Sequence, residues 1–448
     1  MAPPHVLLNA FEMNAVGHLA HGVWSHPEDR ATGYRRIGYW MELARILERG
    51  LFDGLFLADV TGVYDVHDGG AATAIERAVQ LPVNDPAVLV PAMAAVTRHL
   101  GFGITADVSA EPPHLFARRM STLDHLSDGR VAWNIVTGFL DSAARATGAA
   151  GTLPHDDRYD RADDFMQVAY KLWEASWDDD AVIRDRTTRR YADPAKVRAV
   201  RHDGPYFRLD AIHLAEPSPQ RTPVLFQAGT SPKGQAFAGE HAECVFIGGN
   251  SPQQHSKSVE NLRAQAVANG RKAEDLKIFG AITVIVGQTD AQALGKLADY
   301  RQYGSHEGAL ALLSGWMGTD LSTLELDAKI TEVQSDAIQF ALAENETATV
   351  RQWASGLAVG GAGPVISGSP ESVANQLNDW FITSGLDGFN LAYTVMPECV
   401  DDFVDLVIPQ LQEMGVFKTS YRQGSFREKL FGRSARLTAP HVGSTYTR

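Results

Sequence analysis

Eight short apolar runs, separated by segments with the hydrophobic spacing of helices, constrain the fold of this chain more than any other feature. The runs are apolar throughout instead of alternating with polar residues, as is typical of parallel strands that are buried on both faces. Strands that alternate with helical segments indicate βα units and a parallel sheet. The runs occupy residues 6–10, 53–59, 101–106, 131–136, 224–227, 243–247, 277–286 and 387–393.

This count predicts a (β/α)8 TIM barrel, in which residues 1–448 form a single domain. Two polar segments interrupt the alternation and are expected to be insertions, residues 181–216 after the fourth strand and residues 304–363 after the seventh. The first insertion is expected to contain a short hairpin near residues 202–209. The tail, residues 415–448, is expected to wrap around the body or a neighbouring chain. A doubly wound open sheet is the alternative, but no GxGxxG motif follows the first strand.

The composition excludes several classes of partner. The formal net charge of -14 argues against nucleic acid and anionic membranes. The two cysteines, Cys244 and Cys399, are too few for a disulfide framework or a cysteine metal cluster, which favours a reducing cytoplasm. No signal peptide is recognisable, and no run of about 18 apolar residues predicts a membrane span.

The most informative local stretch, residues 223–244, reads as a strand, a turn and a helix. Gly229 permits the sharp turn, Thr230 or Ser231 can cap the helix, and Pro232 suits its first turn. The free N–H groups and the positive end of such a helix form a site for a phosphate. An ordinary strand–turn–helix joint has the same pattern, so the motif alone leaves both interpretations open.

The residues that follow the strands are mostly polar and uncharged. In a TIM barrel, functional groups gather at this end of the strands. We find no HExxH, GxSxG or Cys/His pairing, so a cofactor that performs the chemistry itself is favoured. A metal site at His18, His21 and Asp59 is the alternative, although we predict no metal. The strand ends carry Asn9, Glu12, Asn14, His18, Asp59, Tyr64, Thr105, Asn134, Thr137, Gln227, Gly229, Thr230, Ser231 and Tyr393.

Seven stretches together resemble the bacterial-luciferase-like flavin monooxygenases. The resemblance is to the branch of nitrilotriacetate, dibenzothiophene-sulfone, dimethyl-sulfide and long-chain-alkane monooxygenases, and it extends from about residue 6 to residue 432. The stretches are LNAFEMNAVGHLAHGVWSHP, DGLFLADVTGVYDV, VQLPVNDP, RRMSTLDHLSDGRVAWNIVT, HDDRYDRADDFM, YKLWEASWDDDAV and EPSPQRTPVLFQAGTSPKG.

The resemblance implies a two-component enzyme. Reduced FMN, delivered by a separate NAD(P)H:flavin reductase, would activate O2 as a flavin hydroperoxide or peroxide and oxygenate a small organic substrate. It also implies a homodimer or homotetramer. The residues that would bind FMN are Asp59, Thr105, Asn134 and Thr137 near the isoalloxazine, His155 and Tyr159 toward the phosphate, and Gly229, Thr230 and Ser231 at the phosphate itself.

His18 and Tyr64 are the candidates at the reactive face, with Gln80 lining the pocket. Relatives that hydroxylate long-chain alkanes carry a cysteine where this chain has Ala15 and a histidine where it has Phe139. These departures predict a more apolar and aromatic pocket, with Phe139, Trp316 and Met317 as walls. Such a pocket suits an apolar, aromatic, heteroaromatic or organosulfur substrate, and cleavage of a riboflavin-type side chain is also open.

Three other functions remain open. A deazaflavin (F420)-dependent dehydrogenase would use the same barrel for hydride transfer without O2. A flavin-binding protein without turnover would serve storage. A metal-dependent hydrolase would act without flavin.

Overall fold

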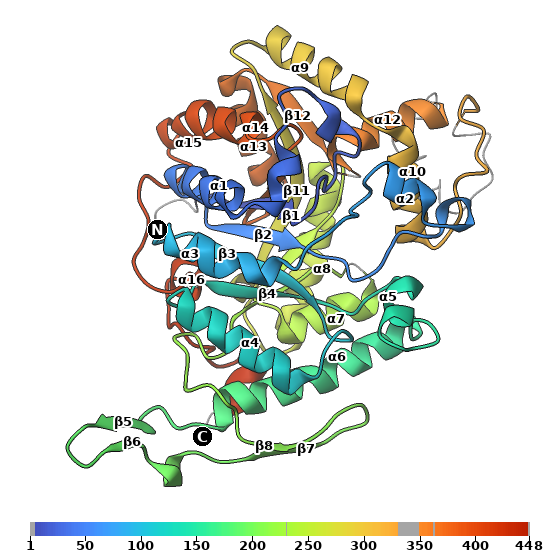
Figure 1. Cartoon of the computed structure of the whole chain (residues 1–448). Coiled ribbons are helices and arrows are strands. Elements are labelled where there is room, and N and C mark those ends of the chain that lie inside the picture. Colours follow the sequence, from blue (N-terminus) through green and yellow to red (C-terminus); the bar gives the residue numbers. More distant parts are fainter. Residues whose placement is uncertain (1–4, 230, 330–348, 362, 447–448) are drawn as a thin grey trace.

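Eight parallel strands close into a barrel, which confirms the predicted fold (Figure 1). The computed structural model describes residues 5–229, 231–329, 349–361 and 363–446. The closed order follows from β13 pairing with β1 and β10 pairing with β11. The barrel strands are β1 (Leu7–Met13), β2 (Gly54–Ala58), β3 (Gly101–Asp107), β4 (Val131–Val136), β9 (Val224–Gln227), β10 (Cys244–Ile247), β11 (Lys277–Val286) and β13 (Gly388–Ala392).

A ninth parallel strand, β12 (Val365–Gly368), lies outside the closure and was not predicted. Strand β11 is long enough to pair twice. Its first part, Phe279–Thr283, pairs with β13, and its second part, Thr283–Val286, pairs with β12.

Helices surround the barrel largely where the sequence predicts them. They are α1 (Ile37–Arg49), α3 (Val90–Ala95), α4 (Pro113–Leu126), α6 (His155–Tyr170), α7 (Pro232–His241), α8 (Pro252–Ala268), α9 (Asp290–Tyr303), α13 (Pro370–Ser384), α14 (Glu398–Asp402) and α15 (Ile408–Glu413).

Two of these predictions needed correction. The hydrophobic spacing predicts a helix over residues 34–49 with Ile37 on its buried face. Helix α1 begins later, and Ile37, its first residue, is 50% exposed. The pair Asp85-Pro86 predicts the start of one helix over residues 85–100. The structure instead has a 3-10 turn, Pro86–Leu89, followed by the short α3. Asp85 does cap the turn, since its carboxylate accepts a bond from the Ala87 N–H at 2.8 Å.

The insertion after β4 forms two hairpins that project below the barrel in Figure 1. The predicted hairpin consists of β7 (Val200–Asp203) and β8 (Arg208–Ala211), whereas the other, β5 (Val182–Asp185) with β6 (Arg190–Ala192), was not predicted. Buried Asp164 of α6 anchors the β7–β8 hairpin. Its carboxylate lies 2.7 Å from His202 Nε2 and accepts the N–H groups of Tyr206 and Phe207.

The C-terminal tail folds onto its own barrel. Helix α16 (Phe426–Phe431) lies at the amino end of the strands, where a Cβ on Gly101 would stand 2.6 Å from the Phe426 ring. The missing side chain at Gly101 therefore provides the space for the ring. The tail therefore wraps around the body of its own chain, which is one of the two arrangements that the sequence left open; the other is a wrap around a neighbouring chain.

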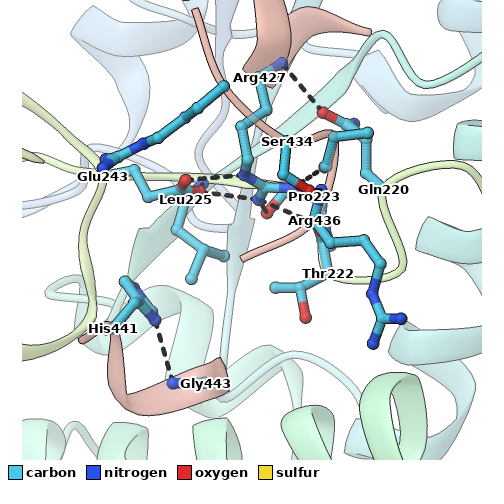
Figure 2. A network of polar contacts seen from close by, with 12 residues as sticks. Gln220, Thr222, Pro223, Leu225, Glu243, Arg427, Ser434, Arg436, His441 and Gly443 are labelled. Atoms are coloured by element: carbon cyan, nitrogen blue, oxygen red, sulfur yellow. Dashed lines mark hydrogen bonds and ion pairs between the residues drawn. The ribbon is translucent and has the colours of Figure 1, made fainter. Parts of the chain in front are cut away.

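Buried Arg427 joins the tail to the barrel (Figure 2). Its guanidinium donates to both carboxylate oxygens of Glu243 at 2.7 and 2.8 Å, and to the carbonyls of Thr222 and Pro223 at 3.0 Å. Because the bond is bidentate and desolvated, it fixes the tail against the start of β9 and β10.

Candidate active site

A cavity of about 960 Å³ opens at the carboxyl ends of the barrel strands. This is the upper part of the range of small-molecule sites, which is roughly 300–1,000 Å³. Twelve of the residues proposed as catalytic, flavin-binding or substrate-pocket residues line it, and so does the strand-end residue Gln227. The twelve are His18, Asp59, Tyr64, Gln80, Thr105, Asn134, Thr137, Phe139, His155, Tyr159, Gly229 and Trp316.

Three residues proposed for the flavin or substrate site are not in this lining, and neither are the strand-end residues Asn9, Glu12, Asn14 and Tyr393. Met317 is one residue beyond Trp316 on α10 (His306–Met317), so it points to another side of the helix and packs with Leu310 and Leu313. Met317 is therefore not part of the cavity wall as the structure describes it. Ser231 caps α7, since its hydroxyl oxygen accepts the Gly234 N–H at 3.1 Å. Thr230 lies outside the described residues.

One end of the cavity is built around Gly229, at the end of β9. A Cβ on Gly229 would collide with the Gln227 amide nitrogen and stand 2.5 Å from the Tyr159 hydroxyl. The Gln227 amide donates to that hydroxyl at 3.5 Å. His155, at the start of α6, lies against Tyr159 with ring centroids 5.3 Å apart. The backbone here can approach a ligand closely because position 229 has no side chain.

The middle of the cavity floor comes from β3 and β4. Thr105 and Asn134 are partners in the parallel register, and the Asn134 amide donates to the Thr105 hydroxyl at 2.9 Å. Asn134 Oδ1 and Gln227 Oε1 are buried and have no hydrogen-bond partner among the described residues. Because unpaired buried acceptors cost free energy, these two oxygens indicate a ligand that donates hydrogen bonds.

His18 lies over the barrel interior against Phe11, with ring centroids 4.3 Å apart. Burial, followed by the nearby His21, lowers the pKa of His18 to about 3, so the imidazole is neutral at ordinary pH. Its Nδ1 is buried without a partner among the described residues. A neutral ring with a free nitrogen can accept or donate one hydrogen bond.

Gln80 connects two of the selected residues. Its Oε1 accepts the Tyr64 hydroxyl proton at 2.9 Å, and its amide donates to the His18 carbonyl at 3.0 Å. Gln80 has φ of 48°, a left-handed conformation that is uncommon outside glycine. Strained residues of this kind concentrate at functional sites.

Two carboxyl groups line the cavity, those of Asp59 and Asp107. Burial raises the pKa of Asp59 to about 7, and the carboxylates of Asp85 and Asp107 add to the shift. Burial also raises the pKa of Asp107. Asp59 can therefore carry a proton near neutral pH.

Several lining residues were missed by the sequence analysis: Asp107, Arg158, Gly248, Gly249 and Gln254. A signal for the glycines was present. The turn Gly249-Asn250-Ser251-Pro252 after β10 repeats the arrangement Gly229-Thr230-Ser231-Pro232 after β9. Ser251 caps α8 as Ser231 caps α7, so two helices begin beside the cavity.

In the parts of the chain that the structure describes, no three His, Cys, Asp or Glu side chains are grouped closely enough to hold a metal ion. Nor does any helix in those parts combine the length and apolar character needed to cross a membrane.

Comparisons with known proteins agree with this geometry. The model of the family described as luciferase-like monooxygenase matches residues 18–388. Dimethyl-sulfide monooxygenase of Hyphomicrobium sulfonivorans is 46% identical, over 98% of this chain and 93% of the relative. Long-chain alkane monooxygenase of Geobacillus thermodenitrificans is also 46% identical, over 98% and 97%.

A solved structure of riboflavin lyase with modified FMN and the substrate riboflavin superposes with a TM-score of 0.91. The two chains are 37% identical, and the match covers 99% of this chain and all of that one (100%).

Proposed function

This chain belongs to the luciferase-like monooxygenase family, and from that premise we propose that it oxygenates a small organic substrate with reduced FMN and O2. The observation that carries the proposal is the glycine cradle at Gly229, which lies in one cavity with the unpaired acceptors of Asn134 and Gln227.

These residues fit FMN. An isoalloxazine has an N–H group that needs an acceptor, and Asn134 Oδ1 is a free one. A phosphate needs backbone N–H groups and a helix N-terminus, which the start of α7 offers. In the proposal, Asp59, Thr105, Asn134 and Thr137 hold the ring system, and His155, Tyr159, Gly229, Thr230 and Ser231 hold the ribityl phosphate.

When bound, reduced FMN supplies the electrons that activate O2. The protein must then orient the substrate, exclude water and manage protons. Neutral His18 and the Tyr64 hydroxyl, held by Gln80, are the proposed groups at the reacting centre. Both can exchange hydrogen bonds there without bringing a charge, because His18 is uncharged and burial raises the pKa of Tyr64.

A separate NAD(P)H:flavin reductase is the proposed source of reduced FMN, as for a two-component enzyme. We also propose that the chain forms a homodimer or homotetramer.

Rapid mixing tests the oxygen chemistry. The protein with reduced FMN is mixed anaerobically and then exposed to O2, while the flavin absorbance is followed. We expect the flavin absorbance to follow a time course that differs from that of free reduced FMN. In the His18→Ala variant, the time course should return toward that of the free flavin. The control is Gly295→Ala on α9, where a Cβ would meet nothing within 4 Å. A wild-type trace identical to free flavin would contradict the proposed function.

A further inference from the structure

Part of the cavity wall is built from three separate segments. They are the loop after β2, the start of α5 (Asp141–Ala146) after β4, and α10 from the second insertion. The first two are joined by Ser142, whose hydroxyl accepts the Val63 N–H at 2.9 Å and donates to the Val63 carbonyl at 2.7 Å.

Within this wall, helix α10 packs on the loop after β2 through Gly315. A Cβ on Gly315 would collide with the Tyr64 ring, so the helix approaches the ring as closely as backbone allows. This contact fixes where Trp316, the next residue, enters the cavity lining.

Two large aromatic side chains of the wall remain uncovered. Phe139 is 45% exposed and Trp316 is 40% exposed, although both line the cavity. Phe139 is also next to Tyr64, with ring centroids 6.5 Å apart. Aromatic surface left open in a concave site favours a ligand that covers it.

The polar atoms of the same wall are already engaged. The Tyr64 hydroxyl donates to Gln80, and the Gln80 amide donates to the His18 carbonyl. The wall therefore offers a ligand mainly the faces and edges of aromatic rings.

The ionisable groups of the cavity offer little attraction to a second anion. Its described lining contains two carboxyl groups, Asp59 and Asp107, and one guanidinium, that of Arg158. Arg158 donates to the Gly138 carbonyl and lies near Asp107. A bound FMN phosphate would add further negative charge, and like charges repel strongly where water is scarce.

We propose that the substrate is an uncharged molecule with an apolar or aromatic surface, recognised by contact with Trp316 and Phe139, and that carboxylated analogues are excluded. This inference rests on the proposed function, because it assigns the Gly229 end to FMN. The proposal distinguishes the substrate of this chain from carboxylate substrates, which bind in charged pockets.

The test uses two probes that differ in one group, benzothiophene and benzothiophene-2-carboxylate. Each is titrated into the flavin-free protein and into the FMN complex, and binding is followed by tryptophan fluorescence and calorimetry. We expect benzothiophene to quench emission and to bind at least about tenfold more tightly than the carboxylate, which corresponds to about 1.4 kcal/mol.

The variant Trp316→Phe should remove that quenching, and Phe139→Leu should weaken binding several-fold while keeping an apolar side chain. Trp24→Phe is the matched control, since Trp24 is also 40% exposed but lies outside the cavity lining. Circular dichroism confirms that each variant is folded.

The outcomes separate the two claims. If FMN binds but the carboxylate binds as tightly as benzothiophene, or Trp316→Phe leaves the quenching intact, the substrate inference is overturned. Lack of saturable binding by either probe overturns it as well. If FMN fails to bind while benzothiophene still quenches Trp316, the proposed function fails, and only the preference of the wall for an uncharged aromatic ligand stands.

Discussion

At the residue scale, the glycine at position 229 decides whether a ligand can reach the strand end. We predict that Gly229→Ala weakens FMN binding by at least about tenfold, because the added methyl occupies the space between Gln227 and Tyr159. Equilibrium titration with FMN measures the change. Gly295→Ala should leave the affinity unaltered, and an unchanged affinity in Gly229→Ala would place the phosphate elsewhere.

A second prediction at the residue scale concerns how the Asp59 carboxyl group makes stability depend on pH. Its pKa is about 7 in the folded protein, well above the ordinary value of 3.8. The folded state therefore holds a proton that the unfolded state releases, and this group lowers stability as pH rises from about 4 to about 7. In Asp59→Asn the melting temperature should depend less on pH across that window. If the melting temperatures of the wild type and Asp59→Asn depend on pH in the same way, the raised pKa of Asp59 is contradicted.

At the element scale, helix α16 is held to the barrel by one buried ion pair. Burial alone would raise the pKa of Glu243, but Arg427 lowers it on balance. The stabilisation from this carboxylate is therefore present above its unfolded pKa near 4.5 and is lost as pH falls through the folded value.

We predict that Arg427→Ala lowers the free energy of unfolding by about 3–5 kcal/mol, since Glu243 stays buried without its partner. Urea titration measures this loss. Arg186→Ala, at the exposed tip of the β5–β6 hairpin, is the control and should change little. Equal stability of the two variants would argue against a structural role for the pair.

The elements differ in how far the sequence predicts them. Barrel strands such as β9 and β11 could be predicted within a residue, because burial on both faces leaves an uninterrupted apolar run. The β5–β6 hairpin was missed because its residues are mostly exposed and polar. The helix predicted over residues 85–100 is divided near Pro91, which lacks the N–H that would continue the Pro86–Leu89 turn as an α-helix.

The residues of the site also differ in how far the sequence predicts them. Asn134 and Gly229 could be predicted because they lie near the carboxyl ends of strands, which the barrel brings together. Asp107, the last residue of β3, lies at such an end as well and could have been found in the same way. Arg158 was missed because its place depends on how the start of α6 meets the loop after β4, where it bonds the Gly138 carbonyl. The sequence does not distinguish Met317 from Trp316, because the direction of each side chain depends on how α10 packs on Tyr64.

At the scale of the whole molecule, the tail closes the end of the barrel opposite the cavity. Phe426 is 1% exposed and packs with Phe226 and Gly101. We predict that Phe426→Ala costs about 3–5 kcal/mol of stability, because a large buried ring leaves a void in the barrel. Thermal unfolding measures the loss. Flavin affinity at temperatures where the variant is folded should be retained, since the site lies at the other end.

Binding of reduced FMN in this cavity is the central claim, and anaerobic titration of the purified protein with reduced FMN tests it most directly. We predict saturable binding that Gly229→Ala weakens and Gly295→Ala does not. Failure of the folded wild-type protein to bind reduced FMN would contradict the assignment of this cavity to a flavin.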